Sequence, residues 1–164
     1  MDTKLKINKL VNTFNLIEHP EGGWYKETYR SSANTKTKNG ERSLLTSIYF
    51  LLSSANQSHF HKIESDEIWF YHEGSPLSVH TISPDGDYKV LKVGLNLENG
   101  EQPQVLVPKG TIFGSTVDES NSYSFVSCAV APGFDFNDFY LHTREELLEA
   151  FPEYKKIINR LTRF

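Results

Sequence analysis

The 164-residue sequence contains a single cysteine, Cys128, so no disulfide can form within the chain, and nothing requires an oxidising compartment. Its longest apolar run, residues 48–52, is far shorter than the roughly 20 residues that a helix needs to cross a bilayer. Residues 1–6 lack the apolar core and the cleavage site of a signal peptide. We therefore expect a cytoplasmic protein with no membrane partner.

The chain also lacks a strong charge of either sign, since 17 basic and 21 acidic residues give a net charge of -4. Lysine and arginine gather in no one stretch, so the clustered positive field that phosphates require is missing, and we expect no nucleic-acid partner. Aromatic residues, by contrast, are abundant at 13%, which favours β structure. The length suits one domain, and we expect residues 1–164 to form it.

Hydrophobic spacing predicts a helix over residues 3–17, which the Pro20 turn and the two glycines after it bring to an end. Between residues 24 and 141, short β-branched or aromatic runs alternate with turn residues, a pattern typical of a sandwich, jelly roll or barrel. The expected strands are residues 24–29, 44–52, 59–63, 67–72, 77–82, 88–95, 104–107, 111–117, 123–131 and 134–141.

Residues 143–162 return to helical spacing. Thr143 and Glu146 form the capping-box pattern that begins a helix. Pro152 interrupts this helix and begins another. The sequence therefore predicts an all-β fold with an N-terminal helix and short C-terminal helices.

Two histidines carry most of the chemical content. His59 and His61 lie two apart in an expected strand, so both imidazoles face the same side. A carboxylate on the next strand, Glu67 or Asp66, completes the set of two histidines and one carboxylate that holds Fe(II) or Mn(II) with open positions. Without a metal, the same groups suit acid–base transfer of a proton at carbon. The alternative interpretation is that the histidines are ordinary packed or exposed strand residues.

These residues also resemble a known family. The first motif of the cupin superfamily is similar to the spacing of His59, His61, Glu67 and Gly74, and the second is similar to residues 107–110. Longer segments resemble a family of small cupins of uncharacterised activity: residues 21–30, 66–69, 73–77 and 131–136. The resemblance implies the cupin jelly roll, a double-stranded β-helix, which forms a homodimer and binds a small molecule.

Two departures from the cupin pattern bear on metal binding. Metal-binding cupins place a histidine after the glycine of the second motif, at the position that Phe113 occupies here. The gap between His61 and Glu67 is also longer than usual, so Asp66 and Glu67 compete for the inward position. The metal-dependent hypothesis therefore rests on a weaker site, with His59, His61 and Glu67 around a divalent ion of iron, manganese, nickel or zinc.

The metal-free hypothesis follows a resemblance to the cupin epimerases that act on nucleotide-linked 4-keto sugars. Those enzymes use a histidine base, an orienting carboxylate and a tyrosine acid, which here implies His61 as the base and Glu67 as the orienting group. Tyr71 shares the expected strand face of Glu67 and is the predicted acid, with Tyr123 as the alternative. Either tyrosine is otherwise a core residue with a hydrogen-bonded hydroxyl.

Further residues are candidates for binding the ligand. Strand alternation places Glu27 and Arg30 on opposite faces. Arg30 suits a ligand carboxylate or phosphate, or an ion pair in a dimer interface. Trp69 and Phe113 are candidates for an apolar wall beside the ligand, and Tyr123 for a further contact.

Three functions fit this sequence. The preferred one is an isomerase-like or epimerase-like enzyme that transfers protons without a metal on a sugar-like or keto-acid-like ligand in the barrel. The second is a metal-dependent isomerase or dioxygenase, and the third is a ligand-binding module without chemistry. The fold does not choose among them, because cupins carry unrelated activities.

Overall fold

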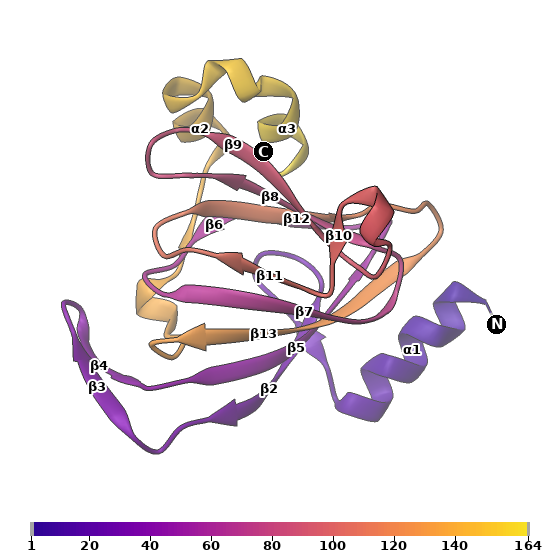
Figure 1. The fold of residues 1–164 in the computed structure, drawn as a ribbon, viewed down its shortest axis with the longest axis horizontal. Helices are drawn as coiled ribbons and strands as arrows, with labels where there is room; N and C mark the ends of the chain where they lie inside the picture. Colours follow the sequence, from indigo (N-terminus) through magenta and orange to yellow (C-terminus); the bar gives the residue numbers. More distant parts are fainter. Residues whose placement is uncertain (1, 164) are drawn as a thin grey trace.

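Two six-stranded β-sheets face each other in the computed structural model, which describes residues 2–163 (Figure 1). The first sheet has the order β1 (Ile17–Glu18), β2 (Trp24–Arg30), β5 (Thr46–Ser53), β13 (Tyr123–Ala131), β7 (Asp66–Gly74) and β11 (Gln104–Val107). The second has the order β10 (Glu101–Gln102), β9 (Tyr88–Val93), β8 (Leu77–Ile82), β12 (Ile112–Val117), β6 (Gln57–Lys62) and β14 (Tyr140–Leu141). The expected jelly roll is confirmed.

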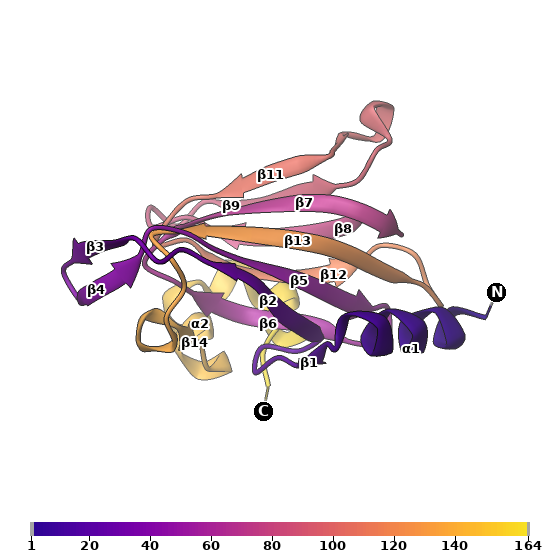
Figure 2. The same cartoon turned by 90° about the horizontal axis from the view of Figure 1, so that it is seen from below.

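The remaining elements lie outside this pair of sheets. A hairpin of β3 (Asn34–Thr37) and β4 (Gly40–Ser43) projects beyond the end of β2 (Figure 2). The helices are α1 (Thr3–Phe14), α2 (Arg144–Ala150) and α3 (Lys155–Arg160), with short 3-10 turns η1 (Leu97–Asn99), η2 (Phe136–Asp138) and η3 (Pro152–Tyr154). Within residues 2–163, no helix combines the length and the apolar character that crossing a membrane demands.

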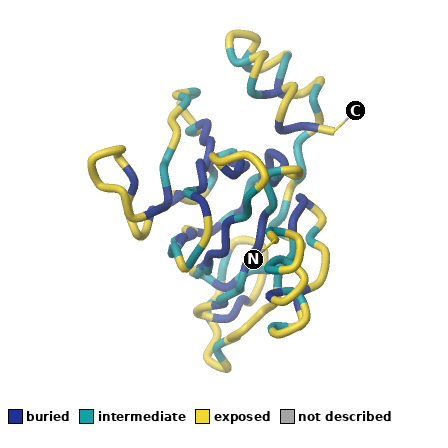
Figure 3. Tube along the Cα trace, turned by 90° about the vertical axis from the view of Figure 1, so that its right-hand side faces the viewer, coloured by how far each residue is buried: buried dark blue, intermediate teal, exposed yellow. Residues whose placement is uncertain are grey.

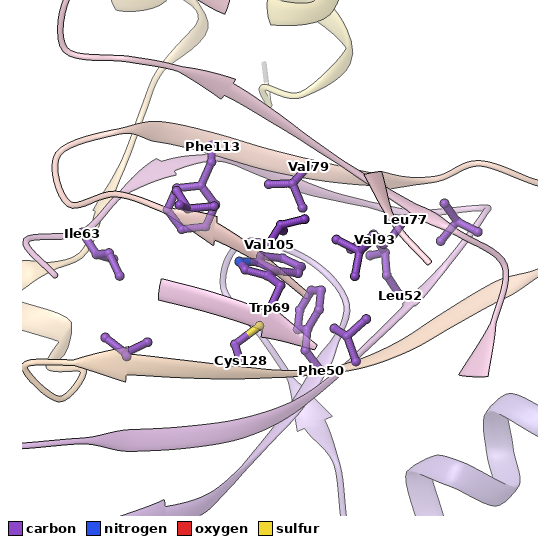
Figure 4. Close-up of a cluster of buried hydrophobic side chains, with 14 residues drawn as sticks. Phe50, Leu52, Ile63, Trp69, Leu77, Val79, Val93, Val105, Phe113 and Cys128 are labelled. Atoms are coloured by element: carbon purple, nitrogen blue, oxygen red, sulfur yellow. The ribbon is translucent and has the colours of Figure 1, made fainter. Parts of the chain in front are cut away.

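Aromatic and aliphatic side chains fill most of the space between the sheets (Figure 4). Phe50 and Trp69 point inward from the first sheet and Phe113 from the second, and each is almost completely buried. Burial of one such side chain stabilises the fold by roughly 1.5–3 kcal/mol. This packed core occupies one part of the barrel interior and leaves the other end open to the site described below.

The helices cover the outer faces of the sheets. Leu10 of α1 packs in one cluster with Leu51 of the first sheet, whereas Leu147 of α2 and Ile158 of α3 pack with Phe60 of β6. In Figure 3 the C-terminal helices are buried along only part of their length. Phe60 faces these helices, whereas the next residue along β6, His61, faces the cavity between the sheets.

The N-terminal helix is shorter than the predicted range of residues 3–17. Asn15 adopts a left-handed conformation with φ of 52°, so the helix ends at Phe14. Ile17 and Glu18 instead pair with β2 as the strand β1. The predicted helix was too long because Ile17 fitted its apolar spacing, although Ile17 is exposed in the structure.

Residues 134–141, predicted as a strand, were assigned wrongly. They form the turn η2 and the two-residue strand β14, because the Asp135 side chain accepts a hydrogen bond from the Asn137 amide and caps the turn. The hairpin β3–β4 was missed because its residues are mostly polar. At the C-terminal end, the predicted capping box between Thr143 and Glu146 is present.

Gly74, which ends β7, lies so close to the backbone of Tyr123 that no other amino acid would fit at this position. Its φ is +97°, and an added Cβ would lie 2.2 Å from the carbonyl oxygen of Tyr123. Gly100 also has a positive φ, +76°, but an added Cβ there would meet nothing within 4 Å.

We expect Gly74→Ala to lower the free energy of unfolding by more than about 2 kcal/mol, because conformational strain adds to the clash. Gly100→Ala is the matched control and should cost only about 1 kcal/mol, from strain alone. Urea unfolding of both variants measures the difference. Equal losses would contradict the role given to the close approach.

Candidate functional site

One end of the barrel contains a cavity of about 370 Å³ between the two sheets. It lies where β5 and β7 begin and where β2, β6 and β13 end. Its apolar lining comprises Tyr25, Ile48, Ile63, Val130, Phe134, Phe136 and Phe139. Its polar lining comprises His19, Glu21, Glu27, Arg30, Thr46, His61, Glu67 and Asp135. This mixture of apolar walls and a few polar groups is typical of a small-molecule site.

Glu21 enters the cavity from the turn between β1 and β2. Its backbone oxygen accepts hydrogen bonds from the His59 amide (2.7 Å) and from His59 Nδ1 (2.6 Å), which fix the turn against β6. Gly22 makes this contact feasible, because a Cβ on it would lie 2.1 Å from the backbone oxygen of Gln57. The Glu21 side chain is thereby aimed inward and is buried.

Glu21 and His61 form a buried ion pair. His61 Nε2 lies 2.7 Å from Glu21 Oε2, and His61 Nδ1 lies 2.8 Å from the backbone oxygen of His59. A carbonyl and a carboxylate both accept hydrogen bonds, so both ring nitrogens donate and the imidazole is a cation. The carboxylate partner of His61 is therefore Glu21, and Glu67, which the sequence predicted, has a different role.

The pKa values of this pair move apart. Burial lowers the pKa of His61, but the Glu21 carboxylate outweighs burial, and the pKa is raised above its ordinary value. Burial raises the pKa of Glu21, but the His61 cation overcomes this and lowers it to about 2. His19 accepts a hydrogen bond from the Glu21 amide, and burial lowers its pKa. The pair is thus charged at neutral pH.

Glu67 is the second carboxyl group in the cavity. Burial raises its pKa, and the nearby Glu21 anion raises it further, to about 7, against the opposing effects of the His61 cation and the Cys128 thiol. Asp66 points the other way, since it is exposed and its carboxylate accepts a hydrogen bond from the Lys109 amide at 2.9 Å. The inward position that the sequence left open therefore belongs to Glu67.

Glu27 and Arg30 line the cavity together. Arg30 donates from Nε to Glu27 Oε1 (2.7 Å) and from Nη2 to Oε2 (3.0 Å) and to the Phe134 carbonyl (3.0 Å). Their predicted placement on opposite strand faces was wrong. A register shift between Glu27 and Tyr29 interrupts the alternation and brings both side chains to the same side.

The two candidate acids, Tyr71 and Tyr123, lie away from the cavity. Tyr71 donates a hydrogen bond to the Gly74 carbonyl at 2.6 Å, and Tyr123 donates one to Glu73 at 2.7 Å. Burial raises both pKa values. Alternation along a strand predicts which face a side chain lies on, but not how far along the strand it lies from the cavity. Tyr71 lies four residues, or about 13 Å, along β7 from Glu67.

The two predicted wall residues belong to the core. Trp69 and Phe113 are each 1% exposed and pack with Phe50, and neither borders the cavity directly. Phe113 still contributes to the site, because it pairs with His61 across β12 and β6 and its ring centroid lies 4.1 Å from that of the imidazole. The ring therefore fixes the orientation of the His61 cation.

The predicted metal ligands are not brought together. His59 borders a different cavity, beside His142 and Arg163, and its Nδ1 is bound to the Glu21 carbonyl. Both nitrogens of His61 are already hydrogen-bonded. Over the described chain, residues 2–163, no group of three or more His, Cys, Asp or Glu side chains is arranged to hold a metal ion. The residues present do not fit a cupin metal site.

Sequence reasoning missed Glu21, Tyr25 and the ring-bearing segment around Phe136. The available signal for Glu21 was the two glycines that follow it, which were interpreted as the end of a helix and as part of a family motif, but not as a sign that Glu21 lines the site. A carboxylate directly before two glycines indicates a backbone that approaches a neighbouring strand closely.

Comparison with known proteins identifies close relatives. A family model described as "Cupin superfamily (DUF985)" matches residues 8–142. The uncharacterised protein YML079W of Saccharomyces cerevisiae is 35% identical in an alignment 159 positions long, which covers 86% of this chain and 78% of that protein. The crystal structure of protein SO0799 from Shewanella oneidensis is 42% identical with a TM-score of 0.89, covering 95% of this chain and 96% of that one.

A more distant likeness concerns the fold alone. Oxalate decarboxylase of Bacillus subtilis is 18% identical with a TM-score of 0.57, and the match covers 88% of this chain and 36% of the decarboxylase. At this identity the likeness extends to the arrangement of the strands and carries no argument about chemistry.

The raised pKa of Glu67 predicts how stability depends on pH. The folded protein holds this proton up to about pH 7, whereas the ordinary value is 4.5. The free energy of unfolding should therefore fall as the pH rises from 4.5 to 7, by up to about 3 kcal/mol. In Glu67→Gln this fall should be absent, whereas the exposed control Asp66→Asn should keep it. Urea unfolding across this pH range measures both, and an unchanged slope in Glu67→Gln would contradict the assignment.

Proposed function

Because this chain belongs to the DUF985 family of the cupin superfamily, which supplies a barrel but no assigned reaction, we propose that it binds a small molecule in the barrel-end cavity and transfers a proton through Glu67. The reaction class is isomerase-like or epimerase-like acid–base chemistry without a metal. The observation that carries the proposal is a buried carboxyl group in a cavity, beside a fixed ion pair.

Glu67 suits proton transfer because an acid–base group works best with a pKa near the working pH. Burial and the Glu21 anion hold its pKa at about 7, so it can both give and take a proton. The proton moves between a Glu67 oxygen and an atom of the ligand, and no electron is gained or lost. Such a group contributes roughly 10²–10⁴-fold to a rate.

Glu21 and His61 are positioning residues in this scheme. The predicted role of His61 as the base does not suit its geometry, because both nitrogens already donate hydrogen bonds. The pair provides a fixed charge beside Glu67 instead. Of its two members, Glu21 has the larger effect on the pKa of Glu67 and raises it.

The size of the cavity limits the ligand. A volume of about 370 Å³ falls at the lower end of the roughly 300–1,000 Å³ usual for ligand pockets. This volume suits the sugar-like or keto-acid-like ligand that the sequence analysis favoured. The homodimer and the cytoplasmic location stay predictions, and light scattering on the purified protein tests the first.

The function is tested by deuterium exchange. Wild-type protein is incubated in D₂O with a panel of monosaccharides, 2-oxo acids and amines, and incorporation at carbon is followed by NMR. We expect a compound that exchanges, at least about 100-fold more slowly with Glu67→Gln and at the wild-type rate with Asp66→Asn. Glu21→Gln should move the pH optimum of exchange downward, because the pKa of Glu67 falls without its anionic neighbour.

Three results would count against the proposal. Exchange that is unchanged in Glu67→Gln would exclude Glu67 as the proton carrier. Exchange that EDTA abolishes, with at least about a tenth of an equivalent of metal in the protein, would favour the metal-dependent alternative. A compound that raises the melting temperature but never exchanges would favour the binding module.

A further inference from the structure

The outer part of the cavity is lined by aromatic rings. Phe134, Phe136 and Phe139 come from the segment between β13 and β14 and form what we term the ring wall. Their centroids lie 4.9 Å (134–136), 6.0 Å (136–139) and 6.2 Å (134–139) apart. Phe136 is 52% exposed, so the ring wall borders solvent. A ligand that enters here passes aromatic faces first.

Carboxyl groups outnumber cations in the same cavity. Glu21, Glu27 and Asp135 line it in addition to Glu67, whereas the cations among its described lining residues are Arg30 and His61. With Glu67 protonated, the lining therefore carries an excess of negative charge. Ionisation of Glu67 increases that excess.

Both cations are already paired with an anion. Arg30 binds both carboxylate oxygens of Glu27, and His61 binds Glu21. An anionic ligand would compete with Glu27 for the Arg30 guanidinium, whereas a cationic ligand would leave both ion pairs intact.

Asp135 provides a further carboxylate beside the ring wall. Its Oδ1 accepts a hydrogen bond from the Asn137 amide, and its charge acts on Arg30 and Arg42. It lies 4.0 Å from Arg42 Nε, but Arg42 is held more closely by Asp138, at 2.7 Å. Asp135 lines the same cavity as its neighbours in the chain, Phe134 and Phe136.

Aromatic faces attract cations because the ring quadrupole makes the electrostatic potential over each face negative, and nearby carboxylates add to this attraction. We propose that the cavity selects an organic cation, a protonated amine or a quaternary ammonium compound, whose charged group lies against the ring wall near Glu27 and Asp135. This inference rests on the proposed function in placing the ligand in the same cavity. It disfavours the keto-acid-like ligand that the sequence suggested.

The test uses three probes of one shape and different charge: choline, 3,3-dimethylbutan-1-ol and 3,3-dimethylbutanoate. Binding to the wild-type protein is measured by isothermal titration calorimetry at pH 7.5. We expect choline to bind at least tenfold more tightly than the neutral alcohol, and the acid to bind most weakly. Equal or tighter binding of the alcohol or of the acid would overturn the proposal, as would no binding of choline at millimolar concentration.

Variants locate the bound cation. Phe136→Leu removes a half-exposed ring and should weaken choline binding about tenfold, whereas Tyr29→Leu removes an exposed ring outside the cavity and should leave it unchanged. Glu27→Gln frees Arg30 and should also weaken binding, with the exposed Glu149→Gln as its control. Choline affinity that is equal in Phe136→Leu and the wild type would contradict the ring wall as the site.

Different results would contradict the two proposals. Choline selectivity with no deuterium exchange in any compound would leave the cation site standing and contradict proton transfer through Glu67. Exchange of a neutral or anionic compound, with no preference for choline over its isosteres, would contradict the cation site and leave Glu67 in its role.

Discussion

The candidate site depends on one buried ion pair, between Glu21 and His61 at 2.7 Å. Two buried charges are tolerated because each satisfies the other and because His61 has a second acceptor in the His59 carbonyl. Removing one partner would leave an uncompensated buried charge, which costs about 3–5 kcal/mol. The pair therefore constrains the turn before β2, the strand β6 and the protonation state of Glu67 together.

Glu21 and Glu67 show how one residue type acquires two roles in one cavity. The His61 cation stabilises the ionised form of Glu21 and lowers its pKa to about 2. Glu67 is buried without such a partner and next to that anion, so its pKa rises to about 7. When neighbouring titratable groups are separated in this way, the environment assigns a permanent charge to one and an exchangeable proton to the other.

The fold was predictable because the strands β8, β11 and β13 carry runs of apolar and β-branched residues bounded by turns. Glu67 and His61 were also predictable, since alternation along a strand gives the face on which a side chain lies. Glu21 was not, because it lies in a turn, where no periodicity applies.

The predictions made for Tyr71 and Arg30 were wrong for related reasons. The prediction for Tyr71 required its distance along β7 from the cavity. The prediction for Arg30 required the position of the bulge in β2. Both are set by pairing with other strands and are absent from the pattern of the strand itself.

The order β2-β5-β13-β7 in the first sheet brings together strands from opposite halves of the chain. Contacts between distant segments require the closure of long loops before any stabilising energy is gained. The cavity takes its lining from the turn before β2 and from the segment after β13, so it is complete only when nearly the whole barrel has formed. A chain that ends before β13, whether released early from synthesis or shortened, would therefore contain the turn that carries Glu21 but would not form the cavity around it.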